Sequence, residues 1–111
     1  MALLTCVAVH VHAHAFLDHA EPRVGTTVQA APTELKLWFT QEIEPAFSSV
    51  KVLDANGKQV DKADAHVDSA DKALLRVSVG VLGPGAYTVS WRVVSVDTHV
   101  TNGDFVFHVG P

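Results

Sequence analysis

The sequence predicts an all-β domain, a β-sandwich or β-barrel of Greek-key type, and three observations lead to this prediction. Hydrophobic residues alternate with polar residues along several short segments, as expected where one face of a strand is buried. Turn-forming residues separate these segments at short intervals. No segment shows the period of roughly three to four residues that marks a long helix. The length of 111 residues fits one such domain.

Five segments carry the strand pattern, and tight turns separate them. One turn is expected at residues 54–57, which contain an Asn-Gly pair, and another at the Gly-Pro-Gly of residues 83–85. Aromatic residues at alternate positions are expected in the core, whereas Trp38 is out of phase with Leu37 and is expected to cover the opposite face. The expected strands lie within residues 35–40, 50–53, 75–79, 87–93 and 105–109.

The composition excludes several classes of protein. The chain has 12 acidic and 8 basic residues and a formal net charge of −4, whereas nucleic-acid-binding domains usually present a basic face. A hydrophobic fraction of 48% is too high for an intrinsically disordered chain. No run of about 18 apolar residues occurs. We therefore expect a folded domain with no nucleic-acid partner and no membrane span in the mature chain.

Residues 1–13 are predicted to be the remnant of a secretory signal peptide. They begin with an apolar, uncharged stretch, and Val11 and Ala13 are the aliphatic and small residues that precede a cleavage point. Cleavage after Ala13 would make His14 the first residue of an exported protein. The segment is short for a signal peptide and lacks a basic start, because no Lys or Arg precedes Arg23. The alternative is a buried N-terminal strand or helix of the domain.

Asp97 and His99 are the first candidates for chemistry. They follow the strand predicted over residues 87–93 and belong to a loop or a strand end. Residues two apart in an extended segment project to the same side, so a carboxylate oxygen and an imidazole nitrogen would face a shared point. This arrangement suits a metal ion. The alternative is an ordinary turn in which Asp97 accepts hydrogen bonds from nearby backbone N–H groups.

His14 strengthens the metal interpretation. As the first residue of the domain 14–111, it would offer both its α-amine and its imidazole Nδ1 to one ion. With His99 and Asp97, the set becomes three nitrogens and one oxygen, which suits the tetragonal geometry of Cu(II). Neither Cys nor Met occurs from His14 onward, so the soft ligands that Cu(I) favours are missing. Zn(II) and Ni(II) are the competing ions.

The remaining histidines and carboxylates are expected to lie outside any site. His19 is expected to face solvent, and its alternative is an extra metal ligand beside Asp18. His108 is also expected to face solvent, and His66 is expected in a solvated loop among acidic residues. Glu42 and Glu44 have no accompanying nucleophile that would make them an acid–base pair.

The segment from Trp91 to Phe107 closely resembles the C-terminal signature of the CopC family of periplasmic copper-resistance proteins. Its sequence is Trp-Arg-Val-Val-Ser-Val-Asp-Thr-His-Val-Thr-Asn-Gly-Asp-Phe-Val-Phe. The Gly-x-Tyr-x-Val-x-Trp strand that ends at Trp91 and the Pro-Arg-Val-Gly of residues 22–25 also resemble this family. The resemblance spans residues 14–111.

The resemblance implies an immunoglobulin-like or cupredoxin-like Greek-key β-fold that binds one Cu(II) ion through His14, Asp97 and His99. It implies a periplasmic, monomeric and non-enzymatic copper carrier or buffer that delivers copper to a CopD-like inner-membrane protein. The Met-rich Cu(I) loop of some family members is missing, because Met1 is the only methionine. At the position of a family carboxylate the chain has Gln41, with Glu42 beside it.

Two other functions stay open on the sequence. One is a copper-dependent oxidative enzyme that uses an N-terminal His site, although a coordinating Asp97 would crowd the position that oxygen needs. The other is a metal-free immunoglobulin-like module for interactions.

Overall fold

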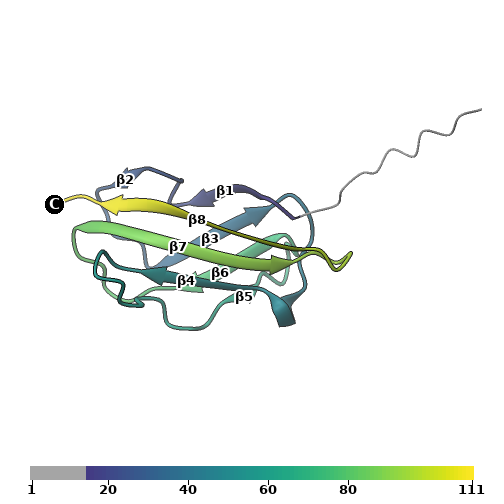
Figure 1. Ribbon diagram of the computed structural model, residues 1–111. Helices are drawn as coiled ribbons and strands as arrows, with labels where there is room; N and C mark the ends of the chain where they lie inside the picture. Colours follow the sequence, from purple (N-terminus) through teal and green to yellow (C-terminus); the bar gives the residue numbers. More distant parts are fainter. Residues whose placement is uncertain (1–14) are drawn as a thin grey trace, which may run out of the picture.

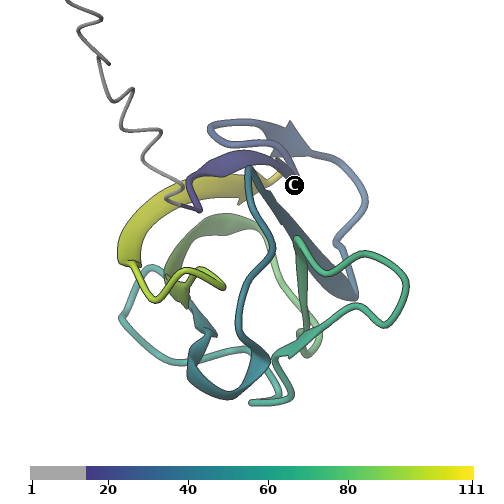
Figure 2. The same ribbon diagram turned by 90° about the vertical axis from the view of Figure 1, so that its right-hand side faces the viewer.

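The computed structural model describes residues 15–111 and shows two four-stranded β-sheets packed face to face (Figure 1). The strands are β1 (Leu17–Glu21), β2 (Thr27–Val28), β3 (Glu34–Phe39), β4 (Ser49–Leu53), β5 (His66–Val67), β6 (Leu74–Ser78), β7 (Gly85–Val94) and β8 (Val100–Val109). One sheet has the order β1-β3-β6-β5 and the other β2-β8-β7-β4. Seen from the end, the sheets curve around a common interior (Figure 2). The predicted all-β sandwich is confirmed.

The five strands with clear alternation are all present, as β3, β4, β6, β7 and β8. Three further strands, β1, β2 and β5, were not predicted. Two of them have only two residues, and β1 shows no alternation of buried and exposed residues. The prediction of a loop at His66 was wrong, because this residue begins β5 and pairs with Arg76 of β6. Its side chain is nevertheless exposed, as expected.

The core lies between the sheets and contains the alternating residues of β3 and β6–β8. Val89 and Phe107, for example, are fully buried. The indole of Trp91 lies across Gly103 on the neighbouring strand, where a Cβ would be only 2.7 Å from Trp91 Cζ2. Only a glycine therefore leaves room for this ring. The expected tight turn is present too, since the Asp54 carboxylate accepts hydrogen bonds from the backbone N–H groups of Asn56 and Lys58.

The outer face of the first sheet carries polar and aromatic side chains. Trp38 points away from the core, as predicted, and the His19 ring stacks on it with a centroid distance of 4.4 Å. Arg76 binds the carboxylates of Glu34 and Asp68 at 2.8 and 2.7 Å. Its hydrogen bonds lower the pKa of both carboxyls, so they remain ionised. These contacts tie β3, β6 and the segment after β5 together.

The β7–β8 hairpin places the predicted metal ligands. Its two strands pair in register from Gly85 with Val109 to Val94 with Val100. The loop that joins them lies at the end of the sandwich opposite the C-terminus (Figure 1). Ile43, between β3 and β4, pairs with Ser95 and closes this end. Within residues 15–111, helices of the length and hydrophobicity that a bilayer span requires are not found.

Candidate metal centre

The loop between β7 and β8 is a tight backbone turn. The N–H of Thr98 donates to the carbonyl of Ser95 at 2.8 Å, and the N–H of Ser95 donates to the carbonyl of His99 at 2.9 Å. Thr98 has a φ of +75°, a left-handed conformation that is uncommon for a β-branched residue. This turn holds residues 97 and 99 close together at the tip of the hairpin.

Asp97 and His99 point their side chains at one another. Asp97 Oδ2 and His99 Nδ1 are 3.0 Å apart, and the two side chains are 33% and 53% exposed. Two ligand atoms bound at right angles, each about 2.0–2.1 Å from one ion, would lie about 2.9 Å apart. The pair thus has the spacing of two neighbouring metal ligands and is open to solvent. The same two atoms are within ion-pair distance of each other.

Ser95 holds the Asp97 carboxylate and was missed by the sequence analysis. Its Oγ donates to Asp97 Oδ1, and its side chain is fully buried. This hydrogen bond, supported by contacts from His99, lowers the pKa of Asp97 below its ordinary value of 3.8. The carboxylate therefore stays charged, as a metal ligand must. The available signal was a serine in phase with the buried Val93, where a hydrophobic residue was expected.

His14 lies outside the described residues, but Ala15, the next residue, lies close to the hairpin. Ala15 is fully buried, and its carbonyl oxygen accepts a hydrogen bond of 2.6 Å from Thr101 Oγ1. Thr101 is in β8, two residues after His99. The chain thus enters the sandwich beside the strand that directly follows one predicted ligand.

The other histidines within residues 15–111 lie apart from this pair. His19 is bound to Asp18 at 2.6 Å, and His66 Nδ1 is 2.9 Å from the carbonyl oxygen of Asp64. His108 is exposed on β8, as predicted. In the part of the chain that the structure describes, no group of three or more His, Cys, Asp or Glu side chains could hold a metal.

The segment that follows β3 borders the loop through its backbone. The carbonyl of Glu42 accepts from the N–H of Val96 at 3.2 Å, and the N–H of Glu44 donates to the carbonyl of Val94 at 2.7 Å. Gln41 and Glu42 are both exposed. Their backbone places this segment next to the hairpin, and a role for either side chain stays a prediction.

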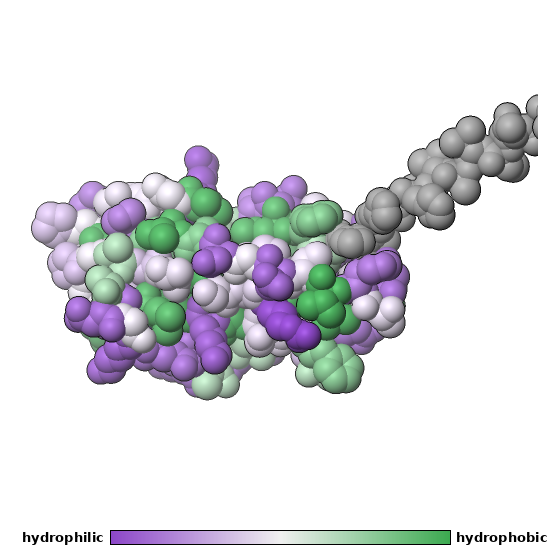
Figure 3. Space-filling view, in the orientation of Figure 1, coloured by the Kyte–Doolittle hydropathy of each residue, from purple (hydrophilic) through white to green (hydrophobic). Residues whose placement is uncertain are grey.

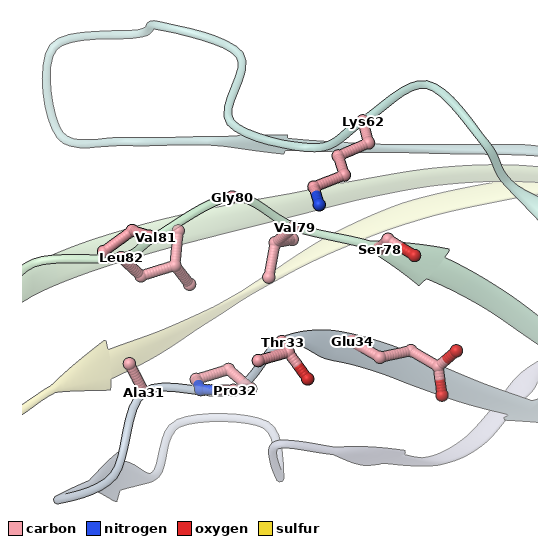
Figure 4. Close-up of a pocket in the computed structure, with 10 residues that line it drawn as sticks. All are labelled: Ala31, Pro32, Thr33, Glu34, Lys62, Ser78, Val79, Gly80, Val81 and Leu82. Carbon is pink, nitrogen blue, oxygen red and sulfur yellow. The ribbon is translucent and has the colours of Figure 1, made fainter.

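A cavity of about 740 Å³ lies away from the loop (Figure 4). It opens between residues 31–34 and 78–82, where Glu34 pairs with Ser78 at the other end of the β3–β6 ladder. Lys62 points toward it. Its lining contains no histidine and no cysteine, and its carboxylate, Glu34, is bound by Arg76, so the cavity lacks the imidazole ligands expected for copper.

Known proteins match this chain over most of its length. The family model of the CopC domain matches residues 17–110. Protein YobA of Escherichia coli strain K12 is 38% identical over 112 residues, which cover 98% of this chain and 90% of that protein. Copper transport protein CutJ of Bacillus subtilis is 26% identical over 99 residues, 88% of this chain and 18% of that protein. The crystal structure of CopC from Methylosinus trichosporium OB3b has a TM-score of 0.82 and 37% identity, covering 88% of this chain and 95% of that one.

Proposed function

The chain belongs to the CopC family of copper-resistance proteins, and on this premise we propose that it binds one Cu(II) ion as a carrier or buffer. The ligands in this proposal are the α-amine and imidazole of His14, the carboxylate of Asp97 and the imidazole of His99. Copper is the cargo of the protein, which performs no reaction on it.

The observation that carries this proposal is the 3.0 Å spacing of Asp97 and His99 at an exposed hairpin tip. The pair supplies one oxygen and one nitrogen, and Ser95 keeps the oxygen ligand ionised. His14 would add two nitrogens from one residue. The resulting three nitrogens and one oxygen favour Cu(II), which prefers a tetragonal set of such ligands and exceeds Zn(II) and Ni(II) in affinity.

The free α-amine of His14 requires cleavage after Ala13. We therefore propose that residues 1–13 are removed on export and that residues 14–111 are the mature, monomeric periplasmic protein. The amine and the imidazoles must lose protons to bind the ion. We accordingly expect the affinity for Cu(II) to fall as the pH drops from about 8 to 6.

The proposed recipient of the copper is a CopD-like inner-membrane protein. CutJ supports a link to transport, because it is named as a copper transport protein. The match to this chain occupies 18% of its length. A similar domain there is one part of a longer chain. A carrier that holds its ion at an exposed tip presents it directly to such a partner.

Replacement of a proposed ligand tests this function. In the protein that begins at His14, His99→Ala and Asp97→Asn should each weaken Cu(II) binding beyond the 10- to 100-fold loss that is typical when only the partner of a metal ligand is removed. His108→Ala is the matched control, because this exposed histidine lies on β8, near its far end and outside the site. Affinities are measured by competition with a chelator. Unchanged binding in His99→Ala would favour a metal-free interaction module.

A further inference from the structure

We infer that Thr101 is a positioning residue of the copper site, because its hydroxyl fixes Ala15, the residue to which His14 is attached. This inference rests on the proposed function. It concerns how a ligand at the chain terminus comes to meet two ligands on a hairpin 83 residues further along the sequence.

The first step is the contact between Thr101 and Ala15. Thr101 is in phase with Phe105 and Phe107, so its side chain faces the interior at the end of the sandwich that carries the β7–β8 loop. Its Oγ1 donates to the Ala15 carbonyl oxygen at 2.6 Å. Since His99 lies two residues before Thr101, this bond joins the N-terminal segment to the strand that directly follows a proposed ligand.

The second step is the contact between Phe16 and the other sheet. The N–H of Phe16 donates to Thr40 Oγ1 at 3.0 Å, and the N–H of Thr40 donates to the carbonyl of Phe16 at 2.8 Å. Thr40 directly follows β3, whereas Thr101 is in β8. Residues 15 and 16 therefore bridge the two sheets at the end that carries the metal loop.

The third step is the burial of Ala15. Its side chain is fully buried and belongs to the core, so neither residue 15 nor its carbonyl can shift without disturbing the packing. Consecutive Cα atoms are about 3.8 Å apart across a trans peptide bond, so an anchored Ala15 limits the reach of the residue before it. A terminus attached to an anchored residue loses less conformational freedom when the ion binds than a free one would. The anchoring of Ala15 should therefore raise the affinity for Cu(II).

The test compares variants in two proteins, one beginning at His14 and one with a single Met added before His14. Thr101→Val keeps the shape and removes the hydroxyl, and Thr101→Ser restores the hydroxyl. In the protein beginning at His14, Thr101→Val should weaken Cu(II) binding about 3- to 10-fold, the value of one hydrogen bond, and alter the copper electron paramagnetic resonance spectrum. Thr101→Ser should bind as the parent does. Thr88→Val, on the outward face of β7, is the control.

The protein with the added Met separates the positioning role of Thr101 from the proposed function. Its amine is no longer on His14, so Thr101→Val should change its weaker binding by less than twofold. If the two parent proteins bind Cu(II) equally, the proposed function fails. If only the protein beginning at His14 binds tightly and Thr101→Val matches its parent there, the positioning role is refuted.

Thermal melting of the metal-free protein shows whether Thr101→Val folds. If it does not fold, a second variant tests the inference. Thr40→Val removes the acceptor for the Phe16 N–H on the other sheet. Thr40→Val should also weaken Cu(II) binding, again only when the chain begins at His14. Parent-like affinity in a folded Thr40→Val protein would then overturn the inference.

Discussion

Ser95, which directly follows β7, orients a proposed metal ligand in the loop. Its Oγ donates to Asp97 Oδ1 while Asp97 Oδ2 faces His99 Nδ1, so the two carboxylate oxygens have different partners. A serine hydroxyl is small enough for a fully buried site and still donates the hydrogen bond that orients the carboxylate. The orientation of Asp97 is therefore set from inside the sandwich, and its second oxygen faces solvent and His99.

Replacement of Ser95 by Ala should raise the pKa of Asp97. The folded protein holds this pKa below 3.8, mainly through the Ser95 hydrogen bond. A depressed carboxyl pKa contributes stability that is present above the unfolded value and is lost as the pH falls through the folded value. Ser95→Ala should therefore reduce this contribution and let Asp97 protonate at higher pH. Carboxyl titration by nuclear magnetic resonance measures the shift.

The same variant should weaken Cu(II) binding about 3- to 10-fold, because the Asp97 carboxylate loses the hydrogen bond that orients it. Ser90→Ala, at an outward position of β7, is the control. An Asp97 pKa in Ser95→Ala equal to that of the parent would contradict the role given to Ser95.

At the scale of the strand, Gly103 determines how β7 and β8 pack. The Trp91 indole occupies the space over Gly103, and Trp91 also contacts Phe39 edge-on at a centroid distance of 5.1 Å. The Trp91 ring therefore contacts both Gly103 of β8 and Phe39 of β3.

Gly103→Ala should destabilise the protein by about 1–3 kcal/mol, the usual cost of overpacking a core. The added Cβ would lie 2.7 Å from Trp91 Cζ2 and force the ring or the strand to move. Chemical denaturation followed by Trp fluorescence measures the loss. Gly83→Ala is the control, because no atom lies within 4 Å of a Cβ at that position. Equal stability of the two variants would show that the ring is not confined as described.

The strands differ in how well the sequence predicts them. Residues 35–40 and 87–93 alternate strictly because one side of each strand faces the core and the other side does not. β1 lies at the edge of its sheet, and its order of exposure follows its pairing with β3 rather than a simple alternation. β2 and β5 have two residues each and form only because neighbouring strands offer partners. Local patterns contain no information about such partners.

At the scale of the molecule, the two ends of the sandwich differ. One end combines the Asp97–His99 pair, the buried Ser95 and the anchored Ala15, whereas the other end has the cavity around Lys62. Figure 3 shows hydrophobic and hydrophilic side chains interspersed over the visible face of the described residues. The proposed site thus lies at one tip of an elongated domain.

The sequence could predict the proposed hairpin ligands but not what holds them. Asp97 and His99 were expected on one side of an extended segment, whereas a tight turn with Thr98 in the left-handed region brings them together. The Thr101–Ala15 hydrogen bond joins residues 86 apart, and it arises from the packing of β8 against the N-terminal segment. Ser95 was overlooked because a buried serine at a strand end resembles any other serine in the sequence. The missed contacts are those that only tertiary structure creates.

The central claim is that His14 supplies a ligand through its own α-amine, and moving that amine tests it most directly. The protein beginning at His14 is compared with the same protein carrying one Met before His14, by chelator competition and electron paramagnetic resonance. Since His14 would chelate with two atoms, the added Met should weaken Cu(II) binding by at least about 100-fold and change the spectrum. Equal affinity and an identical spectrum in the two proteins would contradict the proposed site.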